Sequence, residues 1–210
     1  FAKRVGMRIG IDFDNTIVSY DALFHEIACE RAGMPASIKA NKTCVREHFA
    51  RVGQEPLWTE LQGYVYGSRM QEALIFDGVI DFLERAKAVG HELFVVSHKT
   101  RHPVIGQQYD LHAAAWAWID SHLVCDKEAL LAREKIFFEL TKSDKIARIA
   151  LCECDAFIDD LPEILLETDF PQKTARLLFD PYHHHCNTSA MGLRSFHNWE
   201  SLDAELTWCG

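Results

Sequence analysis

Asp12 and Asp14 form a closely spaced pair of acids near the N-terminus. They stand at the end of a short apolar run that begins at Met7, and Thr16 lies two positions after Asp14. Two carboxylates this close together repel each other, so the pair favours a bound cation or a raised pKa on one of the acids. The spacing therefore predicts a metal site or acid–base chemistry at this point of the chain.

A second acidic pair, Asp159 and Asp160, follows the apolar segment 156–158. Three or four carboxylates that meet in space would form a hard, oxygen-rich site of the kind that suits Mg²⁺. The alternative is that each aspartate only caps a following helix, which would account for a single residue of this kind. Two such pairs, each at the end of an apolar run, favour the metal site.

The segments that must position these acids alternate between two patterns. Short apolar runs typical of buried strands cover residues 7–13, 92–97, 135–140, 156–158 and 175–179. Helical patterns cover residues 20–28, 79–86, 109–122, 142–151, 162–168 and 198–206. This alternation predicts an α/β fold, a three-layer α/β/α Rossmann-like arrangement with helices on both faces of a parallel sheet.

Ligands of such sheets bind outside the carboxyl ends of the strands. Asp12, Asp14, Ser97, Asp159 and Asp160 all fall at or just after predicted strand ends. The topology therefore predicts that a single edge of the sheet carries the chemistry.

The stretch from residue 34 to residue 75 has a different composition. Basic and aromatic side chains mix there with helical periodicity, and the stretch contains no long apolar run. We therefore predict a core formed by residues 1–33 and 76–210, with a small α-helical insert at 34–75 after the first strand–helix unit.

These motifs resemble those of the haloacid-dehalogenase-like (HAD-like) hydrolase superfamily, in its phosphatase branch, over most of the chain outside the insert. Residues 12–16 match the first motif of that family, a strand that ends in Asp-x-Asp-x-Thr, and Ser97 matches the second. Residues 157–160 match the fourth motif, an apolar strand that ends in two acids. The third motif is a lysine that opens a helix, for which Lys145 fits best and Lys142 is the alternative.

The resemblance implies a role for each catalytic residue. Asp12 would attack phosphorus and form an aspartyl-phosphate, while Asp14 would protonate the leaving oxygen and then activate water. Ser97 would donate a hydrogen bond to a phosphoryl oxygen. Lys145 would offset negative charge on Asp12 and on the group being transferred.

The resemblance also implies a Mg²⁺ cofactor. The Asp12 carboxylate, the backbone carbonyl of Asp14 and an acid of the last motif would hold the ion. Asp160 aligns with the usual direct ligand of the family, and Asp159 is the alternative.

Substrate binding is predicted for Thr16 of the first motif and for the loop after Ser97, at His98, Lys99 and Arg101. The alternative for that loop is a solvated connection. The insert 34–75 corresponds to the helical cap that the family commonly carries between its first two motifs, and such a cap contacts the leaving group.

The predicted function is Mg²⁺-dependent hydrolysis of a phosphomonoester of a small soluble metabolite, either a nucleoside monophosphate or a sugar phosphate. A phosphomutase or phosphotransferase with the same intermediate is one alternative, and a non-catalytic regulatory protein that retains the fold is another. Dehalogenases of the superfamily lack the second acid of the first motif, so Asp14 argues against that activity.

The charge composition limits the classes of partner that the protein is expected to bind. The 210 residues carry 22 Lys+Arg against 31 Asp+Glu, a formal net charge of −9 at pH 7, which disfavours a nucleic-acid polymer or an anionic membrane as partner. The seven cysteines are odd in number and scattered, and no signal-peptide-like run precedes them. We therefore predict a cytoplasmic protein with reduced thiols, and the sequence leaves its oligomeric state open.

Overall fold

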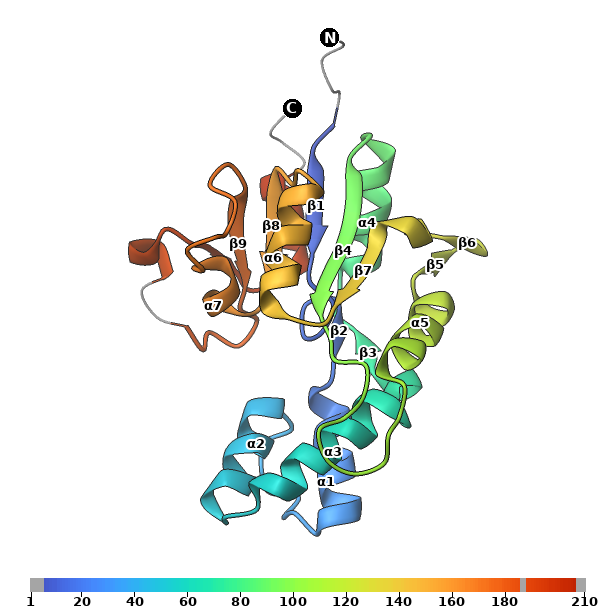
Figure 1. Cartoon of the computed structure of the whole chain (residues 1–210), viewed down its shortest axis with the longest axis vertical. Coiled ribbons are helices and arrows are strands. Elements are labelled where there is room, and N and C mark those ends of the chain that lie inside the picture. The colour runs from blue at the N-terminus through green and yellow to red at the C-terminus, as the bar shows by residue number, and fades with distance from the viewer. Residues whose placement is uncertain (1–5, 186–187, 207–210) are drawn as a thin grey trace. The chain divides into compact units, whose positions relative to one another are not determined.

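The computed structural model describes residues 6–185 and 188–206 of the chain (Figure 1). Their internal contacts divide the chain into two compact units. The sheet unit comprises the residues up to Ile17, Ile75–His98 and the residues from Leu123 onward. The helical unit comprises Val18–Leu74 and Lys99–His122.

Within the described ranges, the sheet unit is built on six parallel strands in the order β10-β9-β8-β1-β4-β7. These strands are β1 (Arg8–Ile11), β4 (Glu92–His98), β7 (Ile136–Glu139), β8 (Ala156–Asp159), β9 (Ala175–Phe179) and β10 (Arg194–Phe196). In the central strand β1, Ile11 lies opposite Val95 of β4 and Ile158 of β8. This register brings the residues that follow Ile11 and Ile158 to the same edge of the sheet.

Helices cover both faces of this sheet (Figure 1). Helices α4 (Val79–Ala88) and α8 (Trp199–Leu206) lie on one face, where the Trp199 ring contacts Phe82 and Phe179 with centroids 5.0 and 5.7 Å apart. Helices α6 (Lys142–Leu151) and α7 (Pro162–Leu165) lie on the other face and bury Ile149 and Leu165. The predicted three-layer α/β/α sheet is thus confirmed.

The helical unit contains α1 (Asp21–Ala32), α2 (Lys42–Arg51), α3 (Glu55–Gly67), the short 3₁₀ helix η1 (Met70–Glu72) and α5 (Leu111–His122). Helix α3 packs against the other three α-helices. An ideal Cβ added to Gly67 of α3 would lie only 2.4 Å from the Cβ of Tyr109, so the absence of a side chain lets the segment before α5 pack closely on α3.

The helical unit contains more of the chain than the predicted insert, residues 34–75. The boundaries of the insert stay a prediction. By contacts, α1 and the segment Lys99–His122 group with the residues of the insert, because α3 packs against both α1 and α5. Periodicity within one element cannot reveal such a pairing between elements.

Several short elements were missed by the sequence analysis. They are β10, the hairpin of β5 (Val124–Cys125) with β6 (Glu128–Ala129), and the pair β2 (Val18–Ser19) with β3 (Leu74–Ile75). Each strand has two or three residues, which is too short for an alternating pattern to stand out. The predicted helix 162–168 shortens to the four residues of α7.

In the described part of the chain, no helix is both long enough and apolar enough to cross a membrane. The cysteines placed there, Cys29, Cys44, Cys125, Cys152 and Cys154, are all free thiols. Cys186 and Cys209 lie outside the described residues.

Candidate active site

Lys145 joins the ends of two neighbouring strands of the sheet unit. Its Nζ atom donates hydrogen bonds to Asp12 Oδ1, just after β1, and to Asp159 Oδ2, at the end of β8, both at 2.6 Å. Lys145 is 2% exposed, Asp12 5% and Asp159 0%. Three ionisable side chains are thus shielded from solvent and paired with one another.

The first turn of α6 decides which lysine reaches this position. The Thr141 side chain accepts a hydrogen bond from the Asp144 N–H at 3.1 Å and so fixes the start of the helix at Lys142. Lys145, one turn further on, lies on the buried face of the helix, whereas Lys142 is half-exposed and pairs with Glu163 at 3.8 Å. The structure therefore places Lys145, and not Lys142, beside Asp12.

Burial shifts the pKa values of this group. For Lys145, burial by itself lowers the pKa, but the charges of Asp12 and Asp159 outweigh it and hold the pKa above its usual range. For Asp159, burial raises the pKa to about 7; Lys145 opposes this rise and Asp12 adds to it. The lysine therefore stays charged, while Asp159 holds its negative charge less readily than an exposed aspartate.

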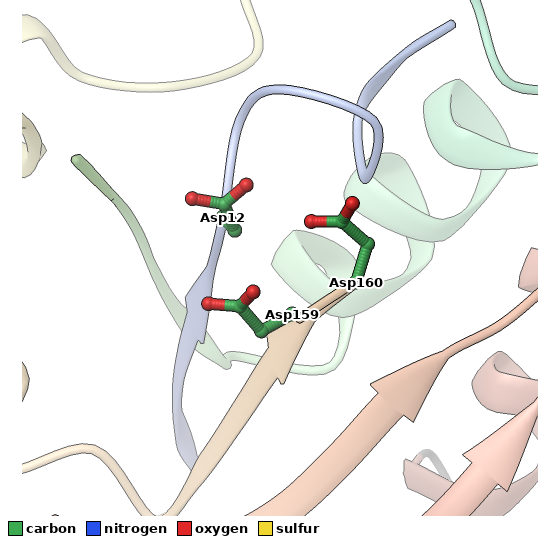
Figure 2. A group of neighbouring side chains, drawn as sticks. All are labelled: Asp12, Asp159 and Asp160. Atoms are coloured by element: carbon green, nitrogen blue, oxygen red, sulfur yellow. The ribbon is translucent and has the colours of Figure 1, made fainter. Parts of the chain in front are cut away.

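Asp160 brings a third carboxylate to the same edge. Figure 2 shows the side chains of Asp12, Asp159 and Asp160 converging from the ends of β1 and β8, and one oxygen of each lies within 4.8 Å of the others. Asp159 already accepts hydrogen bonds on both oxygens, from Lys145 and from the Leu161 N–H at 2.9 Å. Asp160 is less buried than the other two acids. A set of oxygen donors of this kind fits Mg²⁺.

The sheet unit also holds four further residues predicted for the site. Asp14 is partly exposed just after β1, and Ser97 is 1% exposed near the end of β4. Thr16 is fully buried, and its Oγ1 has no hydrogen-bond partner among the described residues. His98, the last residue of β4, is partly buried, and burial lowers its pKa.

The other two predicted substrate-binding residues, Lys99 and Arg101, belong to the helical unit and differ from each other. Lys99 is 4% exposed, and its backbone carbonyl accepts a hydrogen bond from His112 Nε2 at 2.8 Å. The Arg101 side chain is 63% exposed and pairs with Asp110 at 3.0 Å. The loop predicted as one binding element thus contains one buried and one solvated cation.

Thr141 was not singled out by the sequence analysis, although it decides the direction of Lys145. The sequence does contain a pattern that predicts this cap. Thr141 stands three residues before Asp144, and this spacing is typical of the first turn of a helix, where the cap side chain pairs with an acid.

This parallel sheet, with helices on both faces and acids after β1 and β8, has the fold of the HAD-like superfamily. Similar solved structures include a HAD-superfamily hydrolase from Ehrlichia chaffeensis, 12% identical over 98% of both chains with a TM-score of 0.54. A HAD family hydrolase from Deinococcus radiodurans, with bound phosphate and sodium, is 11% identical over 98% of this chain and 96% of its own, with a TM-score of 0.56. The HAD-hydrolase YfnB from Bacillus subtilis, bound to magnesium, is 13% identical over 97% of this chain and 99% of its own, with a TM-score of 0.56. No family model and no curated protein matches the sequence.

Proposed function

We propose that this protein is a Mg²⁺-dependent phosphomonoesterase that acts on a small phosphorylated metabolite. The observation that carries the proposal is the buried Lys145, which bonds both Asp12 and Asp159 beside the carboxylate of Asp160. Phosphoryl transfer needs negative charge to be neutralised at fixed positions, and this group supplies a fixed cation next to a set of metal-binding acids. Similar folds have been solved with phosphate or with magnesium, which agrees with the proposal.

Asp12 is the nucleophile in this proposal. Its carboxylate attacks phosphorus, the bond from phosphorus to the leaving oxygen breaks, and Asp14 gives its proton to that oxygen. Asp14 then takes a proton from water, whose oxygen attacks the aspartyl-phosphate, so that phosphate leaves and the Asp12 carboxylate is restored. Ser97 donates a hydrogen bond to a phosphoryl oxygen, and Lys145 remains protonated throughout.

Asp12, Asp160 and the backbone carbonyl of Asp14 would hold Mg²⁺. When bound, the ion supplies positive charge against which phosphoryl oxygens are stabilised. Asp159 is better suited to orienting Lys145, because both of its oxygens accept hydrogen bonds from the protein. The orphaned Thr16 Oγ1 is a buried polar atom that a bound phosphoryl oxygen would satisfy.

The substrate is small in this proposal, and the place of action is the cytoplasm. The acidic net charge of −9 favours local attraction of a small anion over binding of a nucleic-acid polymer. Within the phosphomonoesters, nucleoside monophosphates and sugar phosphates are the first classes to test.

The test is phosphate release from a panel of phosphomonoesters with Mg²⁺ and with excess chelator. We expect turnover only with the metal and a loss of at least roughly 10⁴-fold in Asp12→Asn, as is typical of a removed nucleophile. Asp14→Asn should spare aryl phosphates more than alkyl phosphates, because aryl leaving groups need less protonation.

Asp169→Asn, which changes an exposed acid of the same unit, is the matched control and should keep wild-type activity. Full turnover in chelator, or in Asp12→Asn, would contradict the proposal. Transfer of the phosphoryl group to a second substrate position without release of phosphate would show a mutase, and a wild-type protein without turnover on the whole panel would favour a regulatory role.

A further inference from the structure

A cavity lies beside β9 and β10 of the sheet unit, and none of the residues predicted for the active site lines it. Its volume of about 420 Å³ is within the range of roughly 300–1,000 Å³ that is typical of ligand pockets. Two segments border it, one that leads into β9 and one that leads from the 3₁₀ helix η3 (Thr188–Met191) into β10. The lining includes Gln172, Thr174, Arg176, Met191, Gly192 and Arg194.

Arg176 is one of the two cations that line this cavity. Its guanidinium carbon lies 5.1 Å from the ring centre of Phe170, which is 1% exposed. Phe170 in turn contacts Phe157 of β8, with ring centroids 6.3 Å apart. The buried ring therefore supports one face of the guanidinium, while the N–H groups at the edge of the guanidinium remain as donors.

The two arginines of the cavity differ in their protein partners. The Arg194 side chain is 53% exposed and pairs with Glu205 of α8. Arg176 is half-buried, and within the described ranges no hydrogen bond or ion pair joins its side chain to another residue. The described residues that line the cavity include no acid. A planar guanidinium in this setting is suited to a bidentate contact with an oxyanion.

Hydrogen bonds hold both borders of the cavity. On the β9 side, the Thr174 hydroxyl donates to the Cys154 carbonyl at 2.7 Å. On the β10 side, the Leu193 N–H donates to the Thr188 carbonyl at 3.0 Å. The borders are therefore fixed before a ligand binds, which lowers the entropic cost of binding.

We propose that this cavity binds a small organic metabolite through a carboxylate or phosphate group. Arg176 binds the oxyanion, and Arg194 and the amide of Gln172 are further donors around the same cavity. The volume is much larger than a single water molecule or simple ion fills, which favours an organic ligand. The proposal goes beyond the phosphatase function and does not depend on it, because no residue of the candidate active site takes part.

Benzoate and phenylphosphonate test the site, because they differ only in the oxyanion, and benzamide is their neutral counterpart. Each is titrated at constant ionic strength in the presence of chelator, and NMR follows the Gly192 backbone amide and the Arg176 Nε–H. We expect saturable shifts of both signals with at least one of the two anions, and none with benzamide. The anion that binds identifies the ligand class as carboxylate or phosphate.

Variants locate the binding energy. Arg176→Met keeps an apolar contact with Phe170 but removes the charge, and should weaken binding about tenfold or more at the Gly192 signal, since a charge-assisted hydrogen bond is lost. Arg194→Gln should weaken it less, by about threefold, because this arginine is exposed and already paired. Lys173→Gln is the control, because Lys173 is an exposed cation of the same segment that does not line the cavity, and it should bind as the wild type does.

Several results would overturn the site. They are the absence of a saturable shift with either anion, equal binding of benzamide, wild-type affinity in Arg176→Met, or an equal loss in Lys173→Gln. If thermal unfolding shows that Arg176→Met does not fold, unchanged affinity in Arg194→Gln would overturn it instead. The titration requires no turnover, so its outcome and that of the phosphatase assay are independent.

Discussion

The two ends of the parallel sheet carry ion pairs built from similar side chains in different surroundings. At the carboxyl end, Lys145 bonds Asp12 and Asp159, and the three side chains are between 0 and 7% exposed. The same strand β1 begins at Arg8, at the opposite end of the sheet.

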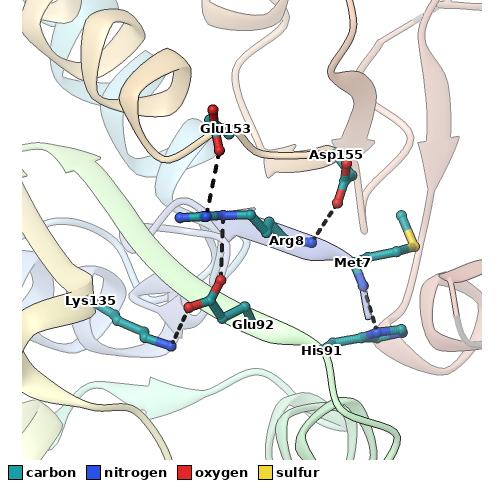
Figure 3. A network of polar contacts seen from close by, with 7 residues as sticks. All are labelled: Met7, Arg8, His91, Glu92, Lys135, Glu153 and Asp155. Atoms are coloured by element: carbon teal, nitrogen blue, oxygen red, sulfur yellow. Dashed lines mark hydrogen bonds and ion pairs between the residues drawn. The ribbon is translucent and has the colours of Figure 1, made fainter. Parts of the chain in front are cut away.

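Figure 3 shows the network at this amino end. Arg8 pairs with Glu92 at 3.4 Å and with Glu153 at 3.7 Å, and Lys135 pairs with Glu92 at 2.9 Å. The side chains in these pairs are between 23 and 77% exposed. Arg8 and Lys135 also lie over the ring of Phe94, at 4.9 and 5.5 Å from its centre.

Solvent exposure separates the two networks in energy. Water screens the amino-end pairs, so each contributes at most about 1 kcal/mol, and the network ties neighbouring strands together. At the carboxyl end water is excluded, so removal of one charge leaves its partners buried without compensation. The carboxyl end therefore keeps buried charged groups at a cost in stability that the amino end does not bear.

Removal of the buried lysine should have the largest effect. Lys145→Met keeps the length of the side chain but leaves Asp12 and Asp159 as two buried acids close together. We expect the free energy of unfolding to fall by about 3–5 kcal/mol, measured by urea unfolding at pH 7 with chelator. A loss below about 1 kcal/mol would mean that the two ends of the sheet are energetically alike.

Gly10 lies on β1 midway between the two networks. Its substitution tests how far a change in the packing of β1 is transmitted to the ion pairs at either end of the sheet. An ideal Cβ at this position would lie 2.5 Å from Phe157 Cδ2 and 2.9 Å from Cys154 Sγ, so alanine requires these side chains or the backbone of β1 to shift. We expect Gly10→Ala to cost about 1–3 kcal/mol by overpacking. Phosphate release should fall as well, because Asp12 directly follows β1 and Asp159 ends β8. Unchanged turnover in a destabilised variant would show that the side chains absorb the shift without moving these acids.

The pH dependence of the free energy of unfolding should reflect the titration of Asp159 at the carboxyl end of the sheet. Asp159 has a pKa of about 7 in the fold against an ordinary value of 3.8, so the folded state holds its proton more tightly between these pH values. The free energy of unfolding should therefore fall as pH rises from about 4 to about 7, with a contribution of up to about 1.4 kcal/mol per pH unit.

Asp159→Asn should remove this contribution, as measured by urea unfolding at several pH values in chelator. Asp155→Asn, which changes the acid that accepts the Arg8 N–H at the amino end, is the control and keeps Asp159 in place. Parallel curves for the wild type and Asp159→Asn would show that Asp159 does not titrate in this range.

The smallest effect is expected at the amino end itself. Lys135→Met removes one partly exposed partner of Glu92 but keeps an apolar contact with Phe94. The free energy of unfolding should change by less than about 1 kcal/mol, and the change should shrink further in high salt. A loss that persists in high salt would show that this network is less screened than its exposure implies.

The strand-end acids show how much of the site was predictable. Asp12, Asp159 and Asp160 were assigned to a common edge because a parallel sheet brings the carboxyl ends of its strands together, and the structure places their oxygens within 4.8 Å of one another. That inference needs only short apolar runs in the right alternation. The same reasoning could not find β10, which has three residues and little pattern of its own.

The sequence by itself determined the α/β class, most of the strands and helices, and the acids at one edge of the sheet, because hydrophobic periodicity and the position of a residue in its element are local properties. Only the tertiary structure decided that Lys145 and not Lys142 reaches Asp12, and that Lys42, Tyr66 and Lys99 come together. These outcomes depend on which face of a helix packs against which neighbour. The cap at Thr141 fixes where α6 begins. The neighbour against which its buried face packs is decided by burial across the whole fold, between residues that are far apart in the chain.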